Sequence, residues 1–142
     1  MFTGPLEDRI AIRELHETYA DAVVRADAAD WAKVWTEDAH WNLMGTAVDG
    51  REGIVALWVQ AMGTLEAVSF HCNPSMTAIH GDRATGRCQT QEIMWFKDGR
   101  KRVVGGLYED AMIKRDGAWR YTSRVFRIVA EYEPPAATQG SD

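Results

Sequence analysis

The residues best suited to chemistry in this sequence are a histidine and a carboxylate on two neighbouring predicted strands. The Gly81-Asp82 dipeptide between two β-prone runs is typical of a two-residue hairpin turn. This turn predicts that His71 lies directly opposite Glu92 on one face, with Cβ atoms about 5 Å apart. An imidazole beside a carboxylate is a common general base near neutral pH, because the anion orients the ring and favours its protonated form. The pattern therefore predicts a catalytic base, His71, oriented by Glu92.

An arginine and two tyrosines are expected near this pair. Two further turns end on Gly99 and Gly117 and predict three-residue loops, which place Arg124 opposite Tyr108. A guanidinium there is suited to hold a substrate carboxylate or to stabilise charge that develops in a transition state. Tyr108 and Tyr19 are candidate proton donors or anchors, so the set suits proton abstraction, elimination or isomerisation without a cofactor.

Alternation along the predicted strands separates two faces. One face is expected to line a cavity under the helices, and it carries His71, Thr90, Glu92, Met94, Val104, Tyr108, Asp110, Thr122 and Arg124. The other face is too apolar for water and predicts a subunit contact in a homo-oligomer, a dimer or trimer; it carries Ile93, Trp95, Leu107, Trp119, Tyr121 and Val125. A single β-bulge would exchange the two faces of a strand.

Purely structural explanations exist for each of these residues. His71 would then be a core histidine, and Glu92 and Arg124 an ordinary ion pair across the sheet. Tyr19 continues an apolar helix stripe, and Asp110 is suited to bond a helix terminus. Trp41 and Trp58 would line the pocket or only fill the core, two alternatives that the sequence leaves open.

Composition excludes several classes of protein. The chain has 142 residues and a net charge of −5, so no basic surface is expected to bind nucleic acid or an anionic membrane. No apolar run approaches the roughly 20 residues that span a bilayer, and we see no signal peptide. We expect one domain over residues 1–133 and a loose tail over 134–142.

The cysteines and histidines show no motif for a metal or a nucleophile. Cys72 and Cys88 are predicted to lie about three residues out of step, or roughly 10 Å, which is too far for a disulfide. We interpret both as buried small hydrophobes in a reducing, cytoplasmic protein. No His pair has metal-ligand spacing, and no phosphate-binding loop or nucleophile elbow occurs.

Periodicity predicts helices first and strands afterwards. Helices are expected over residues 6–28, 30–36 and 51–62, and a short strand over 40–44. Four long strands follow, over 69–79, 84–96, 101–114 and 119–129. Helices packed on one face of an antiparallel meander make an α+β fold.

Several stretches together resemble the SnoaL-like group of the nuclear transport factor 2-like superfamily. They are the Ile12 to Tyr19 helix, Trp35-Thr-Glu-Asp38-Ala-His-Trp41, Gly50-Arg-Glu-Gly-Ile54, His71-Cys-Asn-Pro74, Gly81-Asp-Arg-Ala-Thr-Gly86, Tyr108-Glu-Asp110 and Asp116-Gly-Ala-Trp119 through Arg124. The resemblance to proteins such as scytalone dehydratase, bile-acid 7α-dehydratase and polyketide cyclases implies a cone, a cystatin-like α+β barrel in which a curved antiparallel sheet wraps three helices. It also implies an enzyme without a cofactor that acts on a hydrophobic cyclic or aromatic small molecule. His71 matches the family's dehydratase base, Arg124 its pocket arginine, and Tyr19 its helix tyrosine or lysine.

One position departs from this family pattern. Dehydratase-type members carry an Asp that orients the catalytic His at the position of Val24. Either Glu92 has taken over that role, or the protein has another reaction or none. Our first hypothesis is a lyase or isomerase that uses His71, Glu92, Arg124, Tyr19 and Tyr108, with Trp41, Trp58, Met94, Asp110 and Val24 around the substrate. The alternatives are a non-catalytic binding protein for an apolar metabolite and an assembly module that uses only the apolar sheet face.

Overall fold

The computed structural model describes residues 1–135, so most of the predicted tail lies outside the described residues. Within these residues three helices come early: α1 (Leu6–Arg25), α2 (Ala28–Ala32) and α3 (Arg51–Met62). Seven strands of the described part of the chain form one sheet: β1 (Phe2–Thr3), β2 (Trp35–Leu43), β3 (Thr46–Asp49), β4 (Leu65–His80), β5 (Arg83–Phe96), β6 (Lys101–Arg115) and β7 (Ala118–Tyr132). The predicted α+β class is confirmed.

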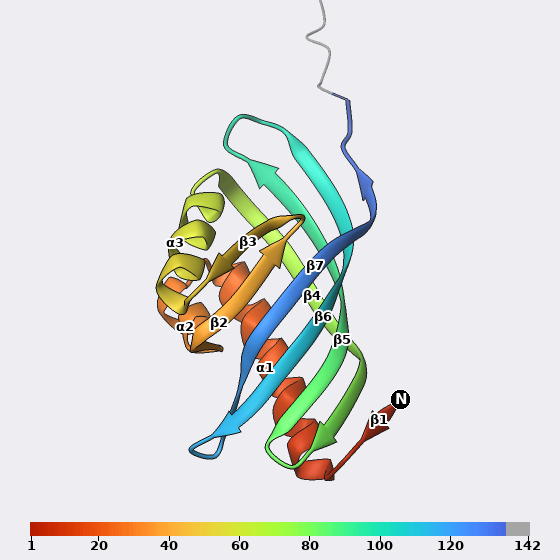
Figure 1. Cartoon of the computed structure of the whole chain (residues 1–142). Coiled ribbons are helices and arrows are strands. Elements are labelled where there is room, and N and C mark those ends of the chain that lie inside the picture. The colour runs from red at the N-terminus through yellow and green to blue at the C-terminus, as the bar shows by residue number, and fades with distance from the viewer. Residues whose placement is uncertain (136–142) are drawn as a thin grey trace, which may run out of the picture.

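The sheet is long, strongly curved and open at its edges (Figure 1). Its strand order is β1-β4-β5-β6-β7-β2-β3, and the four long strands form the predicted antiparallel meander. The sheet is mixed rather than purely antiparallel, because β2 pairs with β7 and β1 with β4 in parallel. Helix α1 lies along the concave side, while α3 lies beside the β2–β3 hairpin (Figure 1).

The helices differ from the predicted ones mainly at their ends. Helix α3 has the predicted bounds, whereas α1 stops at Arg25 because Ala26 adopts a left-handed conformation with φ of 53°. Asp27 then caps α2 by accepting a hydrogen bond of 2.9 Å from the Asp30 backbone N–H. The predicted second helix over 30–36 is wrong in extent, because Trp35 already pairs with β7 as the first residue of β2.

A bulge in β4 changes which side chains face the cavity. Pairing follows the predicted register from the Gly81-Asp82 turn as far as Met76, and then Ser75 is left without a partner. Beyond the bulge the register moves by one residue, so His71 lies opposite Gln91 and its side chain is exposed on the outer face. The predicted placement of His71 beside Glu92 is therefore wrong, since one extra residue reverses the alternation.

A second irregularity alters β7. The turn before it has two residues, because Asp116 and Gly117 both take positive φ values (52° and 76°), and not the predicted three. A bulge at Thr122 shifts the register again, so that Tyr108 lies opposite Phe126 rather than Arg124. The two shifts together keep Arg124 on the inner face. The shorter turn by itself brings Tyr121 inward, although this residue was predicted on the outer face.

The core is a cluster of aromatic rings between the helices and the concave side of the sheet. Trp31 stacks on Trp58 with ring centroids 4.6 Å apart, and Trp35 packs edge-on against Trp31 at 5.4 Å. Space is tight where β6 crosses this layer, since a Cβ on Gly106 would lie 2.2 Å from the Phe126 ring. Packing thus explains most of the six tryptophans.

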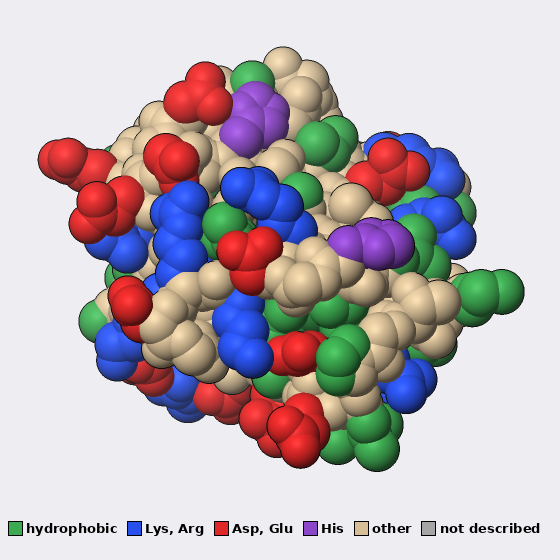
Figure 2. Space-filling model, turned by 60° about the horizontal axis from the view of Figure 1, so that its bottom comes forward, with side chains coloured by type: hydrophobic (Ala, Val, Ile, Leu, Met, Phe, Trp, Pro, Cys, Tyr) green, Lys and Arg blue, Asp and Glu red, His purple; other side chains and the backbone are tan. Residues whose placement is uncertain are grey.

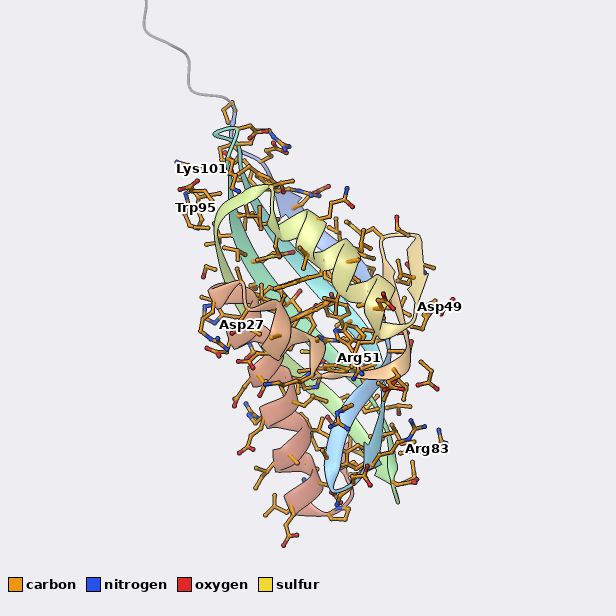
Figure 3. The ribbon with its side chains drawn as sticks, turned by 90° about the vertical axis from the view of Figure 1, so that its left-hand side faces the viewer. Asp27, Asp49, Arg51, Arg83, Trp95 and Lys101 are labelled. Carbon is orange, nitrogen blue, oxygen red and sulfur yellow. The ribbon has the colours of Figure 1, made fainter. Side chains whose placement is uncertain are left out.

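The outer face of the sheet is partly apolar, as predicted. Ile93, Trp95 and Val125 are exposed there, and Figure 3 shows Trp95 and Lys101 pointing away from the helices. Trp119 is 5% exposed and therefore does not belong to this surface. The homo-oligomer stays a prediction.

Charged side chains of both signs are interspersed on the end of the molecule shown in Figure 2. No helix within residues 1–135 is both long and apolar enough to span a bilayer.

Candidate functional site

A cavity of about 220 Å³ lies between the concave side of the sheet and the helices. Most of its wall is apolar, which suits a hydrophobic ligand of small size. Its lining comes from α1, α3, all the strands from β2 to β7 except β3, and the turns after β2 and α3: Tyr19, Val23, Trp41, Leu43, Met44, Trp58, Ala61, Met62, Thr64, Leu65, Val68, Phe70, Glu92, Met94, Phe96, Arg102, Val104, Tyr108, Phe126 and Ile128.

Two tyrosine hydroxyls meet inside this cavity. The Tyr19 and Tyr108 hydroxyl oxygens lie 3.1 Å apart, and the Trp41 indole N–H donates to the Tyr108 oxygen at 3.3 Å. Burial raises the pKa of Tyr108 to about 12 and that of Tyr19 well above its ordinary value. Both hydroxyls therefore keep their protons near neutral pH and act as hydrogen-bond donors.

Glu92 is the carboxyl group in the cavity wall. It points inward from β5, opposite Phe70, and forms no hydrogen bond or salt bridge with any residue in 1–135. Burial raises the pKa of Glu92 to about 7, and the opposing attraction of the Arg102 guanidinium is the smaller effect. The carboxyl group is therefore divided between its acid and base forms near neutral pH, the condition in which one group serves proton transfer best.

Arg124 and Asp110 form a closed ion pair behind the tyrosines. The Arg124 Nε and Nη2 atoms donate to the two Asp110 oxygens at 2.7 and 3.1 Å, and both side chains are fully buried. The Arg124 guanidinium carbon lies 3.8 Å from the centre of the Tyr108 ring and 4.5 Å from that of Tyr19. The cation thus faces the tyrosine rings and does not line the cavity.

The predicted site residues are only partly brought together. Six of them line the cavity, namely Tyr19, Trp41, Trp58, Glu92, Met94 and Tyr108. His71 is exposed on the outer face, and Val24 is 51% exposed on α1 while its neighbour Val23 lines the cavity. Asp110 and Arg124 lie behind the wall as each other's partners, which corrects the alternative in which Arg124 pairs with Glu92.

Arg102 and Phe70 are lining residues that the sequence analysis missed. Arg102 alternates in phase with Val104 and Tyr108 on β6, so the same pattern that placed those two would have placed it. It pairs with Glu131 of β7. Phe70 faces inward only because of the β4 bulge, and no local signal would have found it.

The cysteines are much closer together than predicted. The bulge leaves them two residues out of step on the same inner face, with the sulfur atoms 3.0 Å apart. His16 of α1 joins them, so these three are the residues that could hold a metal within 1–135. None of them lines the cavity.

Comparison with known proteins agrees with this architecture. Residues 4–125 match the family model described as a SnoaL-like domain, so the chain belongs to the SnoaL-like family. Its fold is that of the nuclear transport factor 2-like superfamily, and the resemblance expected from the motifs is confirmed. A search of curated protein sequences finds no match.

Solved structures share the fold over nearly the whole chain. One from Novosphingobium aromaticivorans, provisionally named an aromatic ring hydroxylase, is 27% identical, with a TM-score of 0.86 and coverage of 93% of this chain and 96% of that one. A provisional scytalone dehydratase from the same species is 19% identical, with a TM-score of 0.83 and coverage of 96% and 97%. The hexachlorocyclohexane dehydrochlorinase LinA, type 2, is 17% identical, with a TM-score of 0.84 and coverage of 96% and 95%.

Proposed function

We propose that this protein is a cofactor-independent lyase or isomerase that acts on a hydrophobic cyclic or aromatic small molecule, with Glu92 as its acid–base group. The observation that carries the proposal is the Glu92 carboxyl, which has a pKa of about 7 and no partner among residues 1–135, in the same mainly apolar cavity as the Tyr19–Tyr108 hydroxyl pair. The dehydratase and dehydrochlorinase names of proteins with this fold support an elimination. Glu92 replaces His71 as the base, because His71 faces away from the cavity.

The proposed step begins with the ionised form of Glu92. Its carboxylate removes a proton from a carbon of the bound ring, the electron pair forms a carbon–carbon double bond, and the leaving group departs from the neighbouring carbon. If the carbon lies beside a carbonyl group, the same proton removal gives an enolate, and returning the proton elsewhere completes an isomerisation. The tyrosine hydroxyls donate hydrogen bonds to the oxygen or leaving group on which negative charge develops.

Arg124 supports this step without touching the substrate. Its positive charge lies against the faces of the Tyr108 and Tyr19 rings and lowers the pKa of both hydroxyls, opposing the larger effect of burial. A hydroxyl with a lower pKa is a stronger donor to a developing anion. Arg124 is therefore a positioning residue in this proposal and not a substrate ligand.

The test measures proton transfer and binding separately. Solvent deuterium incorporation into a cyclic aromatic ketone, 1-tetralone, reports proton abstraction, and hexachlorocyclohexane and scytalone report elimination. We expect Glu92→Gln to lower these rates by about 10²- to 10⁴-fold. Ligand binding is followed by quenching of tryptophan fluorescence, to which the lining residues Trp41 and Trp58 contribute. The dissociation constant of Glu92→Gln should stay within about threefold of the wild-type value.

Glu109→Gln is the matched control, because Glu109 is an exposed carboxylate on the adjacent strand β6. It should change neither rates nor binding. The second candidate function, a non-catalytic binding protein, is favoured by the mainly apolar wall of the cavity. Tight binding with no turnover and no deuterium exchange in the wild-type protein would support the binding protein and refute the enzyme.

A further inference from the structure

Three potential metal ligands from three separate elements meet in the core, outside the cavity. They are His16 of α1, Cys72 of β4 and Cys88 of β5, and their exposed fractions are 0%, 8% and 0%. One ligand atom from each lies within 4.8 Å of the others, and the two sulfur atoms are 3.0 Å apart. Two thiols and one imidazole form a donor set that proteins use for thiophilic cations.

The His16 ring is held in the orientation that a metal ligand needs. Its Nδ1 atom and the Tyr121 hydroxyl oxygen lie 2.6 Å apart, so a second group fixes the ring. Its Nε2 atom is buried and has no hydrogen-bond partner among residues 1–135. A buried nitrogen without a partner is costly, on the order of 1 to 3 kcal/mol. His16 Nε2 is therefore available to bind a cation, because no other group within residues 1–135 is its hydrogen-bond partner.

The β4 bulge creates this cluster. Without the extra residue at Ser75, Cys72 would face outward, and only the shifted register brings it beside Cys88. A hydrogen bond stabilises the bulge, since the Ser75 hydroxyl donates to the Arg87 carbonyl oxygen at 3.3 Å.

We propose that His16 Nε2, Cys72 Sγ and Cys88 Sγ form a buried binding site for a soft, closed-shell cation, Zn²⁺ or Cu⁺. Binding replaces the two thiol protons, which leave to solvent, by two metal–sulfur bonds, and no oxidant or reductant is needed. With metal–sulfur bonds of about 2.3 Å, the sulfur atoms lie about 3.8 Å apart, so they separate by less than about 1 Å.

Charge balance distinguishes the two cations. Zn²⁺ with two thiolates is neutral, and it needs one more ligand to complete the four that this ion prefers. Cu⁺ with two thiolates carries one negative charge and is satisfied by three soft donors. The buried Arg124 guanidinium attracts a negative charge on either cysteine, and its Nη1 atom has no hydrogen-bond partner within the described chain.

The test uses the full chain, produced in medium supplemented with Zn²⁺ or with copper and purified without oxygen. We expect about one metal ion per chain by elemental analysis and native mass spectrometry, and a higher melting temperature than that of protein refolded with a chelator. Replacement by Co²⁺ during refolding should produce a near-ultraviolet absorption band from thiolate-to-metal charge transfer. The two supplemented preparations, with competing chelators of known affinity, decide between the ions.

Variants separate this site from adventitious binding. Cys72→Ser and Cys88→Ser are nearly isosteric and should each lower affinity at least 100-fold, and Tyr121→Phe should lower it about 10-fold by releasing the His16 ring. His71→Gln is the matched control and should bind normally, because His71 is exposed. Metal binding that survives both serine variants would overturn the proposal. The proposal would also be overturned if wild-type protein from both media is free of metal and takes up no Zn²⁺, Cu⁺ or Co²⁺ on refolding. Isolation of the wild-type protein with Cys72 and Cys88 joined in a disulfide would overturn it as well.

Discussion

Two polar groups on the concave side of the sheet differ in how their charge is compensated. Behind the tyrosines, Arg124 and Asp110 are fully buried and make two hydrogen bonds with each other. In the cavity wall, the half-buried Glu92 lies among mostly apolar side chains, is attracted only by the Arg102 guanidinium, and forms no hydrogen bond or salt bridge within residues 1–135. The buried ion pair contributes to structure, whereas the Glu92 carboxyl, with a pKa of about 7, titrates near neutral pH. The same sheet therefore separates a structural charge from a group suited to proton transfer.

The largest effect is expected from breaking the ion pair. Asp110→Ala leaves the Arg124 charge buried without its partner and should lower the free energy of unfolding by about 3 to 5 kcal/mol. Urea titration measures this loss. Glu109 is an exposed carboxylate next to Asp110 on β6, and Glu109→Ala should change the free energy of unfolding by less than about 0.5 kcal/mol. If Asp110→Ala lowers the free energy of unfolding by less than about 1 kcal/mol, the Arg124–Asp110 pair does not have the structural role assigned to it.

Glu92 should make stability depend on pH in the opposite way from a paired carboxylate. Its pKa is raised from 4.5 to about 7 by folding, so the folded state favours the protonated form. Its contribution to stability is therefore present below pH 4.5 and is lost as the pH rises toward about 7, by on the order of 2 to 3 kcal/mol. The difference in unfolding free energy between wild type and Glu92→Gln, measured from pH 4 to pH 8, isolates this effect. A difference that does not change with pH would contradict the raised pKa.

The tyrosine pair connects the two regions, and removing one hydroxyl should have an intermediate effect. Tyr108→Phe removes the partner of the Tyr19 hydroxyl and the acceptor of the Trp41 N–H, at a cost of about 1 to 2 kcal/mol. Thermal unfolding of Tyr108→Phe, Tyr19→Phe and the double variant measures the coupling. Strictly additive losses would mean that the two hydroxyls do not interact.

The smallest effect is expected at the residue that the sequence favoured most. His71→Ala should change the unfolding free energy by less than about 0.5 kcal/mol and leave turnover unchanged, because the ring is exposed on the outer face. Steady-state rates and urea titration check both. A large loss of turnover in His71→Ala would place the reaction on the outer face of the sheet and would contradict Glu92 as the acid–base group.

Strands without an extra residue were predicted better than strands that carry a bulge. The β5–β6 hairpin was right along its whole length, because neither strand carries a bulge, and Glu92, Val104 and Tyr108 face inward as expected. In β4 the register was right up to Met76 and wrong beyond Ser75. In β7 the shorter turn already reverses Tyr121, and the bulge at Thr122 restores the inward face of Arg124, so each irregularity reverses the side chains only as far as the next one.

For charged residues, the sequence predicted the face of the sheet better than it predicted the partner of each side chain. Asp110 and Arg124 were both expected on the inner face, but their pairing depends on the two-residue turn before β7 and on the bulge at Thr122. His16 lies on the buried side of α1, and nothing local indicated that two cysteines from distant strands would meet it.

By itself, the sequence determined the order of helices and strands, the family, and the inward face of β5 and β6, because periodicity and turn residues act over a few positions. The tertiary structure alone decided that Glu92 lies in a mainly apolar cavity without a partner among the described residues, that His71 is outside the cavity, and that His16 meets two cysteines. These outcomes depend on single bulge residues and on contacts between distant elements. Their energies arise only when the chain is packed.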